Sequence, residues 1–405
     1  MDKKKNDNLE IFDHAPIPRA ILTNTVPAMA AMLMVLVYNL ADTFFVGQTH
    51  NALMVAAVSL ATPVFLMFMA LGTIFGIGGT SVISRSLGEK KADYARRVSS
   101  FCMWGSVVTG LLFAALVFLL ADPILHLIGA SEDTWDYTKE YLLIVTAAGP
   151  FVLLSNCYAN IIRAEGRAGT AMAGQLIGNL LNVLLDPLLI LGLGWGVVGA
   201  AIATSVSTVA GAMFYILYLF SGKSMLAPFL RYFTWKEGIL QNVLSIGIPA
   251  SLGDMLMSVS NIASNALISA YGDMAVAGFG VAMKVTMITG MICIGFGQGV
   301  QPLFGYCIGA QKWVRFKKSL YLSAVSAFTM STVMTIFCYL FIHPLISAVL
   351  TDPSAFEYAR QFARILLSTS FFGGLYYVFL NALQALGEAG RALVINLSRH
   401  GLIYL

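Results

Sequence analysis

Long apolar stretches constrain this chain more than any other feature. Eleven runs approach or exceed the length of about 20 residues that a helix needs to cross a bilayer. The sequence is 58% hydrophobic and only 11% charged, whereas a soluble domain has about 25% charged residues. The chain is therefore predicted to be an all-α, polytopic membrane protein, with spans near 18–46, 54–83, 95–121, 138–162, 168–192, 197–221, 239–271, 276–308, 316–342, 356–383 and 389–405.

Positive charge collects in alternate loops. Nineteen of the 24 Lys and Arg residues lie in the N-terminal tail or after the second, fourth, sixth, eighth and tenth spans. The opposite loops contain Lys139, Arg360 and Arg364 together with acidic segments. The positive-inside rule then places the N-terminus in the cytosol. Residues 1–17 lack the apolar core of a signal peptide, so they are predicted to be a cytosolic tail of a multi-pass cell-membrane protein.

The sequence also contains an internal repeat. Pro27 aligns with Pro249 at an offset of 222 residues, and after a one-residue slip the offset is 221. The later matches include Gly88 with Gly309, Lys91 with Lys312, and Asn160 with Asn381. Both copies begin on the same side, which predicts two six-helix bundles related by a pseudo-twofold axis along the membrane normal.

The repeat sets the expected domain boundaries. We expect a tail at 1–17, an N-terminal lobe at 18–221, a cytosolic linker at 222–238 and a C-terminal lobe at 239–405. Residue 405 corresponds to residue 184 of the first copy. We therefore expect a truncated second bundle, with about eleven of twelve spans present.

A polar stripe interrupts the fifth span. Asn179, Asn182 and Asp186 are spaced i, i+3 and i+7, so they share one face of a helix. A carboxylate in hydrocarbon costs several kcal/mol and normally faces a cavity or a partner. Pro187 follows directly and leaves one backbone carbonyl unpaired a turn earlier.

The first span carries a second acid. Asp42 shares a helical face with Tyr38 and Asn39, and it lies at the same depth as Asp186. Two carboxylates at one depth in one bundle suggest a single site. The alternative is that each merely caps an irregular backbone near a helix end. Pro27 and Pro187 are candidate bending points, or static kinks.

Further polar residues lie within other spans. Asn160 and Thr204 are predicted either to line the same cavity or to make helix–helix hydrogen bonds. In the second half, Asp254 and Lys284 either pair structurally, or Asp254 faces a central cavity and attracts a cationic substrate. Further candidates for the substrate cavity are Tyr38, Asn39, Asn179 and Asn381.

No soluble catalytic signature is present. The chain has no Walker A, GxSxG or HExxH motif, and its five cysteines form no CxxC pair. We expect no enzyme activity and no cofactor, and we expect an ion gradient to be the energy source.

Four segments resemble one family. They are YNLADTFFVG (38–47), SLGEKKADYARR (86–97), IIRAEGRAG (161–169) and NVLLDPLLILGLGWGVVGAAIAT (182–204). In this layout the chain resembles the multidrug and toxic compound extrusion (MATE) family of cation-coupled exporters. The resemblance implies two lobes around a central V-shaped cleft, and exchange of H⁺ or Na⁺ for an organic cation.

The resemblance also assigns roles by motif position. It implies a cation or proton site in the N-terminal lobe, formed by Asp42, Asn160, Asn182, Asp186 and Thr204. Our hypothesis is proton antiport. Na⁺ held by Asp42, Asp186 and Asn182 is the near alternative, because carboxylate and amide oxygens suit a hard cation. We expect a monomer whose partners are small organic cations and the lipid bilayer, with no nucleic acid.

Two other functions compete with this hypothesis. A flippase for a lipid-linked precursor has a related architecture, but it requires a strongly basic cavity. Here only Lys284 and Arg399 are candidate intramembrane cations, against three acids. A non-transporting scaffold leaves the buried acids unexplained.

Overall fold

The computed structural model describes residues 9–49, 51–347 and 353–399. These residues form helices joined by loops, and they contain no strand. The fold class predicted from the sequence is confirmed. The elements are α2 (Ile17–Gly47), α3 (Ala52–Gly88), α4 (Ala92–Leu119), α5 (Ala121–Leu127), α6 (Trp135–Ala147), α7 (Gly149–Ala164), α8 (Ala168–Asp186), a π-helical segment η1 (Pro187–Gly192), α9 (Gly196–Phe220), a short 3₁₀ turn η2 (Leu230–Tyr232), α10 (Ile239–Ser269), α11 (Asp273–Gly309), α12 (Trp313–Leu340), α13 (Ile342–Ser347), α14 (Pro353–Ser370), α15 (Gly373–Leu386) and α16 (Ala389–Leu397).

The predicted spans correspond to these helices. Within the described residues, eight helical segments are long and apolar enough to cross a membrane, and two bent helix pairs raise the total to ten. The predicted eleventh span begins with α16. Its last residues, 400–405, lie outside the described part of the chain.

The fourth and tenth spans are bent, which the sequence analysis did not predict. α6 and α7 meet at 52°, and α14 and α15 meet at 47°. Pro150 stands in the first turn of α7, where a missing N–H costs nothing but the preceding helix cannot continue unchanged. Gly373 and Gly374 begin α15. Proline and glycine are the usual causes of such sharp bends.

The element boundaries repeat along the chain. α3 ends at Gly88 and α11 at Gly309, 221 residues later. The same spacing separates the starts of α4 and α12, of α5 and α13, and of α8 and α16. These boundaries agree with the offset found in the sequence.

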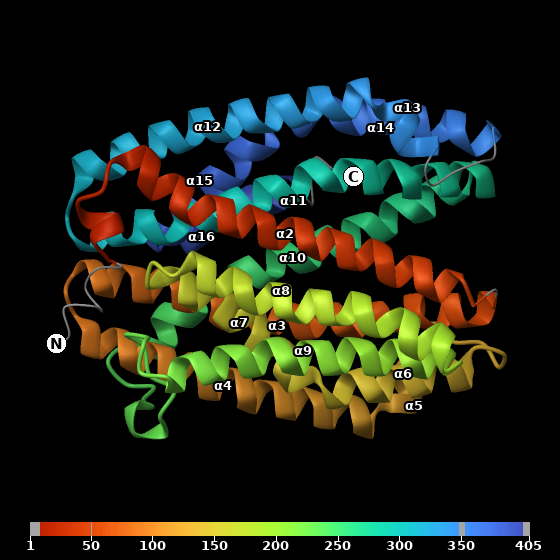
Figure 1. Ribbon diagram of the computed structural model, residues 1–405, viewed down its shortest axis with the longest axis horizontal. Coiled ribbons are helices and arrows are strands. Elements are labelled where there is room, and N and C mark those ends of the chain that lie inside the picture. The colour runs from red at the N-terminus through yellow and green to blue at the C-terminus, as the bar shows by residue number, and fades with distance from the viewer. Residues whose placement is uncertain (1–8, 50, 348–352, 400–405) are drawn as a thin grey trace.

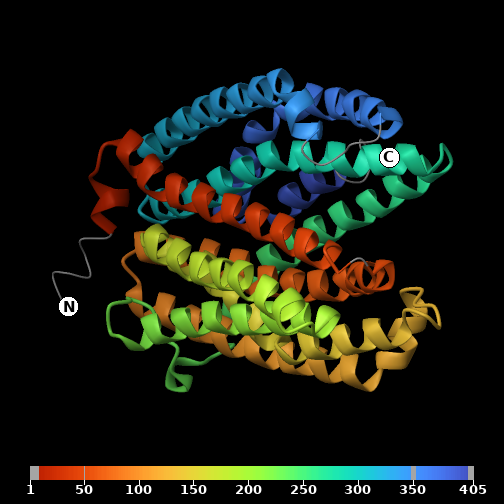
Figure 2. The ribbon, with the colours of Figure 1, turned by 45° about the vertical axis from the view of Figure 1, so that its right-hand side comes forward.

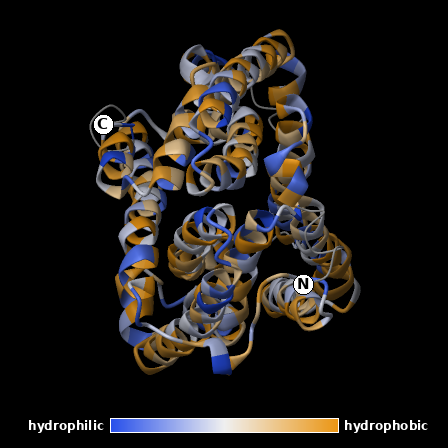
Figure 3. Ribbon diagram, turned by 90° about the vertical axis from the view of Figure 1, so that its left-hand side faces the viewer, coloured by the Kyte–Doolittle hydropathy of each residue, from blue (hydrophilic) through white to orange (hydrophobic). Residues whose placement is uncertain are grey.

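The helices form two groups with two oblique helices between them. α3 to α9 make the first group and α11 to α16 the second, while α2 and α10 run between them (Figures 1 and 2). α2 packs against α8 and α11, and α10 packs against α3 and α16. We call the end where α2, α4, α8, α10 and α12 begin the basic end, because most of the Lys and Arg residues lie there. Figure 3 looks onto this end and shows the two groups nearly end on.

The hydrophobic core is shared at the basic end and divided at the other. One cluster joins both groups and includes Ile21 of α2, Val243 of α10 and Phe304 of α11. Towards the opposite end, a second cluster around Phe68 draws only on α2 and the first group. A third, around Leu367, draws only on the second group. The groups are therefore held together chiefly through the half that contains the basic end.

Glycine permits the closest approach between the groups. A Cβ atom added to Gly247 of α10 would collide with the backbone of Ile74 in α3, and one added to Gly309 of α11 would collide with the backbone of Arg85. Gly290, farther along α11 towards the opposite end, has nothing within 4 Å of an added Cβ. Backbone-to-backbone packing thus occurs in the basic half.

We predict that Gly247→Ala lowers the free energy of unfolding by about 1–3 kcal/mol, because the methyl group overpacks the α3–α10 crossing. Gly290→Ala is the matched control, and it should be neutral or slightly stabilising since alanine favours helix. Thermal unfolding in detergent measures both effects. Equal melting temperatures for the two variants would contradict this account of the crossing.

Candidate functional site

A buried polar cluster lies where α8 ends. Asp186 is the last residue of α8 and is 0% exposed, and Asn182, one turn earlier, is 2% exposed. The Asn182 side-chain amide donates to Asp186 Oδ1 at 3.4 Å and to Thr204 Oγ1 of α9 at 3.5 Å. Three of the predicted site residues are therefore in direct contact.

Asp42 of α2 faces the same cluster. It is half-buried and lies close enough to Asp186 for the two carboxyl groups to interact electrostatically. Tyr38, one turn earlier in α2, interacts with both acids. The structure therefore brings together the two carboxyl groups that the sequence placed at one depth.

Tyr141 of α6 completes this cluster, and the sequence analysis missed it. It is 7% exposed and lies within electrostatic reach of Asp42, Asp186 and the hydroxyl of Thr204. The available signal was a tyrosine within the fourth span, but the bend between α6 and α7 hid which way its helix faces. We name Asp42, Asp186, Asn182, Thr204, Tyr38 and Tyr141 the acidic cluster.

Several polar atoms of this region have no hydrogen-bond partner among the described residues. They are Asp42 Oδ1, Asn182 Oδ1, Asp186 Oδ2 and Asn179 Nδ2. A buried polar atom left unpaired costs about 1–3 kcal/mol. Three of these four atoms are oxygens that accept a proton, a hydrogen-bond donor or a hard cation. The donor set therefore fits H⁺ and also fits Na⁺.

The two candidate bending points have different surroundings. Pro187 follows Asp186 and opens the π-helical segment η1, a conformation that is often found at functional sites. Pro27 lies inside α2, just before Ala28 and Met29, whose backbone packs against Gly295 of α11. The two candidate bending points are thus a π segment and a helix crossing.

Asn160 belongs to a different network. Its oxygen accepts from Arg163 Nη1 at 3.1 Å, and its amide donates to the Asn156 carbonyl at 2.9 Å. Arg163 also donates to Gln298 of α11 at 2.7 Å and to Gln175 of α8 at 3.2 Å. Arg163 is predicted from the sequence to be a charge in the loop after the fourth span. In the structure, Arg163 lies inside α7 and is 2% exposed. Asn160 therefore takes part in a contact between the two groups, apart from the acidic cluster.

The remaining candidates are dispersed. Asn39 donates to its own helix, at the Val35 carbonyl. Asp254 of α10 is exposed and interacts with Thr73 of α3. Lys284 is half-buried, and within the described residues no ion pair joins it to Asp254.

In the second group, Asn381 and Arg399 are engaged locally. The Asn381 amide donates to the Tyr377 carbonyl at 2.8 Å. The Arg399 guanidinium lies 3.9 Å from the ring centroid of Tyr376. The structure pairs neither residue with the acidic cluster.

A carboxylate outside the membrane spans fixes the loop after α9. Glu165 is 1% exposed and accepts hydrogen bonds from the Tyr218 and Ser224 hydroxyls and the Met225 N–H, all at 2.8 Å. Burial raises the pKa of Glu165 above its usual range, although these hydrogen bonds oppose the shift. This role was not predictable from the sequence.

The fold and the acidic cluster define a polytopic membrane protein with unpaired polar groups inside its bundle. The MatE family model matches the chain in two segments, residues 27–188 and 249–404. The multidrug export protein MepA of Staphylococcus haemolyticus is 30% identical over 395 residues, which covers 98% of this chain and 87% of that protein.

Solved structures of MATE transporters have the same fold as this chain. A structure described as MATE in complex with MaL6 has a TM-score of 0.92 at 26% identity and covers 100% of this chain and 89% of its own. Another, described as the outward-facing conformation of a multidrug resistance MATE family transporter of the MOP superfamily, has a TM-score of 0.91 at 26% identity and covers 98% and 88%. The chain therefore belongs to the MatE family, whose members are transporters and not enzymes.

We predict that Glu165→Gln lowers the free energy of unfolding by about 1–3 kcal/mol, because a glutamine amide cannot accept the bonds that one carboxylate oxygen now accepts. The folded-state pKa of Glu165 lies above its usual value of 4.5, so this residue makes stability fall as pH rises through that interval. The Glu165→Gln variant should lack this part of the pH dependence of stability.

Thermal unfolding across a pH series measures both effects. Glu140→Gln, which alters an exposed carboxylate at the opposite end, is the control. Identical melting curves for the Glu165 variant and the wild type would contradict the role assigned to this carboxylate.

Proposed function

We propose that this chain is a proton-coupled antiporter that exports organic cationic or amphiphilic drugs across the cell membrane. The observation that carries the proposal is the acidic cluster. Two carboxyl groups lie within electrostatic reach of each other inside an apolar bundle, and each has an oxygen without a partner among the described residues. Charging both in a low-dielectric site is costly, so the pair favours a state that binds a proton or another cation.

The proposed orientation puts the basic end in the cytosol. Its Lys and Arg residues outnumber those of the opposite loops, as the positive-inside rule requires of a cytosolic face. The shared core at this end and the divided cores at the other support an outward-open arrangement. The proposed lobes are 18–221 and 239–405, joined by a cytosolic linker at 222–238.

The substrate class follows from charge. Asp42, Asp186 and Asp254 are intramembrane acids, against two intramembrane cations, Lys284 and Arg399, of which Arg399 is stacked on Tyr376. A cationic ligand is complementary to this balance. Relatives described as multidrug export proteins support the same class. A strongly basic cavity, which a flippase for a pyrophosphate-linked lipid requires, has no counterpart in these contacts.

Coupling arises if proton and drug favour different states of the same lobe. In this mechanism a proton that enters from outside neutralises one carboxyl group, and the hydrogen bonds that Asn182 donates to Asp186 and Thr204 rearrange. α2 then shifts near Pro27, which changes the surface offered to the drug. A ligand moves such an equilibrium only by its difference in affinity for the two states. Release of the proton to the cytosol restores the starting state.

We predict that Asp42→Asn and Asp186→Asn each abolish gradient-driven export while the protein is still made and inserted, because an amide cannot carry the exchangeable proton. Dye efflux from cells, normalised to the amount of protein in the membrane, measures this. Asp136→Asn, an exposed carboxylate at the opposite end, is the control. Near-normal efflux by the Asp42 and Asp186 variants would remove the acidic cluster from the mechanism.

The coupling ion has its own test. In vesicles that contain the purified full-length protein, we predict that an imposed pH gradient drives drug accumulation and that a protonophore abolishes it, with no requirement for Na⁺. Accumulation that needs a Na⁺ gradient and survives the protonophore would instead assign Na⁺ to the oxygens of Asp42, Asp186 and Asn182.

A further inference from the structure

A pocket of about 570 Å³ lies at the basic end, where α12 begins. Its walls come from the first residue of α2 and the first turns of α12. The lining residues are Ile17, Gln311, Lys312, Trp313, Val314, Arg315 and Lys318. The pocket is remote from the acidic cluster, which lies near the other ends of α2 and α8, and the proposed transport cycle does not use it.

The pocket combines positive charge with exposed apolar surface. Trp313 is 44% exposed and Val314 is 70% exposed, at the point where the membrane-spanning segment Trp313–Leu340 begins. Tryptophan is enriched at the level of lipid headgroups. α12 also starts without a side-chain cap, and the free N–H groups at the start of a long helix favour an anion.

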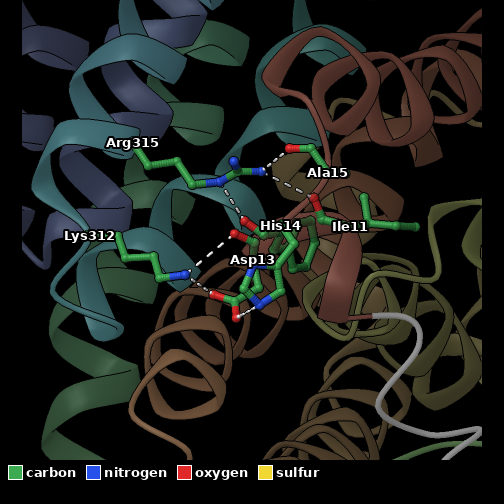
Figure 4. A network of polar contacts seen from close by, with 7 residues as sticks. Ile11, Asp13, His14, Ala15, Lys312 and Arg315 are labelled. Atoms are coloured by element: carbon green, nitrogen blue, oxygen red, sulfur yellow. Dashed lines mark hydrogen bonds and ion pairs between the residues drawn. The ribbon is translucent and has the colours of Figure 1, made fainter.

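Two of the cations hold the N-terminal segment in place. Lys312 pairs with Asp13 at 2.5 Å, and the charge and hydrogen bond of Lys312 hold the pKa of Asp13 below its usual range even though partial burial opposes this. Arg315 donates to the carbonyls of Phe12 at 2.7 Å and Ala15 at 2.6 Å (Figure 4). The residues before α2, expected to be a plain tail, are thus packed against α12, and Phe12 is fully buried.

Two more lysines, one lining the pocket and one beside it, have no acidic partner in the part of the chain that the structure describes. Lys317 and Lys318 are exposed, and no ion pair includes either of them within residues 9–49, 51–347 and 353–399. Long lysine side chains next to a bilayer lay their methylenes along apolar surface and place their charge at the headgroups.

The internal repeat offers a built-in comparison. In the first copy, the equivalent pair is Arg96 and Arg97. Arg96 pairs with Asp93 at 2.9 Å, and Arg97 pairs with Glu237. The first copy therefore neutralises both cations with carboxylates of its own chain.

The described part of the second copy lacks the first of these carboxylates. Val314 stands 221 residues after Asp93, so an exposed apolar side chain replaces the carboxylate. Lys317 and Lys318 keep the positive charge of the arginines, and no carboxylate of the described residues pairs with either of them. An exposed valine beside unpaired lysines suits a ligand that brings both an anion and a hydrocarbon chain.

We propose that this pocket binds the phosphate headgroup of an anionic phospholipid, with Lys317, Lys318 and the start of α12 contacting the phosphate and Trp313 and Val314 contacting the upper acyl chain. Basic residues next to a membrane surface attract anionic lipids by about 1 kcal/mol each. The bound lipid contacts both α12 and Ile17, the first residue of α2, and so joins the second group to the helix that carries Asp42.

The test removes the two unpaired lysines from the full-length protein. Thermal unfolding in neutral detergent is followed while phosphatidylglycerol or phosphatidylcholine is added. We expect phosphatidylglycerol to raise the melting temperature of the wild type more than phosphatidylcholine does. Lys317→Gln with Lys318→Gln should raise the half-saturating phosphatidylglycerol concentration about 25-fold, from the loss of two such attractions.

Lys223→Gln with Lys236→Gln is the matched control, since it removes two exposed lysines from the same end and should keep the wild-type response. Equal responses of the two double variants, or equal effects of the two lipids, would overturn the proposal. Glycerol phosphate that reproduces the full shift would also overturn it, because the ligand would then be a free phosphate.

A second readout does not depend on the lysine variants. Brominated phosphatidylglycerol should quench tryptophan fluorescence of the wild type more than brominated phosphatidylcholine, and Trp313→Phe should lose the difference. Persistence of the difference in that variant would place the lipid elsewhere. Both measurements are independent of transport, so Asp42→Asn should bind lipid normally even if the proposed drug export proves wrong.

Discussion

The structure depends on keeping carboxyl groups inside an apolar bundle. An acid at the centre of a membrane helix costs about 2.5–3.5 kcal/mol on insertion scales, yet Asp186 is fully buried and Asp42 lies beside it. Asn182 donates only long hydrogen bonds, of 3.4 Å to Asp186 and 3.5 Å to Thr204. The acidic cluster thus contains buried polar atoms without hydrogen-bond partners among the described residues, whereas in a purely structural network buried polar groups are normally paired.

The position of the acidic cluster in the bundle matters as much as its chemistry. Asp42 and Asp186 lie near the ends of α2 and α8 farthest from the basic end. That is the half in which the two groups have separate cores, whereas the basic half is joined by a shared core and by close crossings such as Gly247 on Ile74. In the proposed mechanism, a change of charge therefore acts in the half where the two groups have separate cores, while Arg163 and Gln298 bridge the groups elsewhere.

Much of this was predictable from the sequence, for identifiable reasons. The spans and the repeat could be predicted directly, because they depend only on the order of residues along the chain. Apolar runs indicate the spans, loop charges indicate the orientation, and the 221-residue offset indicates the repeat. Asp42 and Asp186 stood out because acids are rare in hydrocarbon. Tyr141, Arg163 and the buried Phe12 could not be identified, because their roles depend on bends and on contacts between distant helices. The bend between α6 and α7 depends on local backbone geometry, and the hydropathy of the sequence contains no information about that geometry.

In the proposed mechanism, a proton at the acidic cluster and an organic cation compete for the same lobe, because each favours a different state of it. The most direct measurement is proton release when an organic cation binds to the purified full-length protein in weakly buffered detergent solution, read with a pH indicator. The account predicts net proton release by the wild type and none by the double variant Asp42→Asn with Asp186→Asn. Equal proton release by both proteins, or cation binding by the wild type without any release, would contradict it.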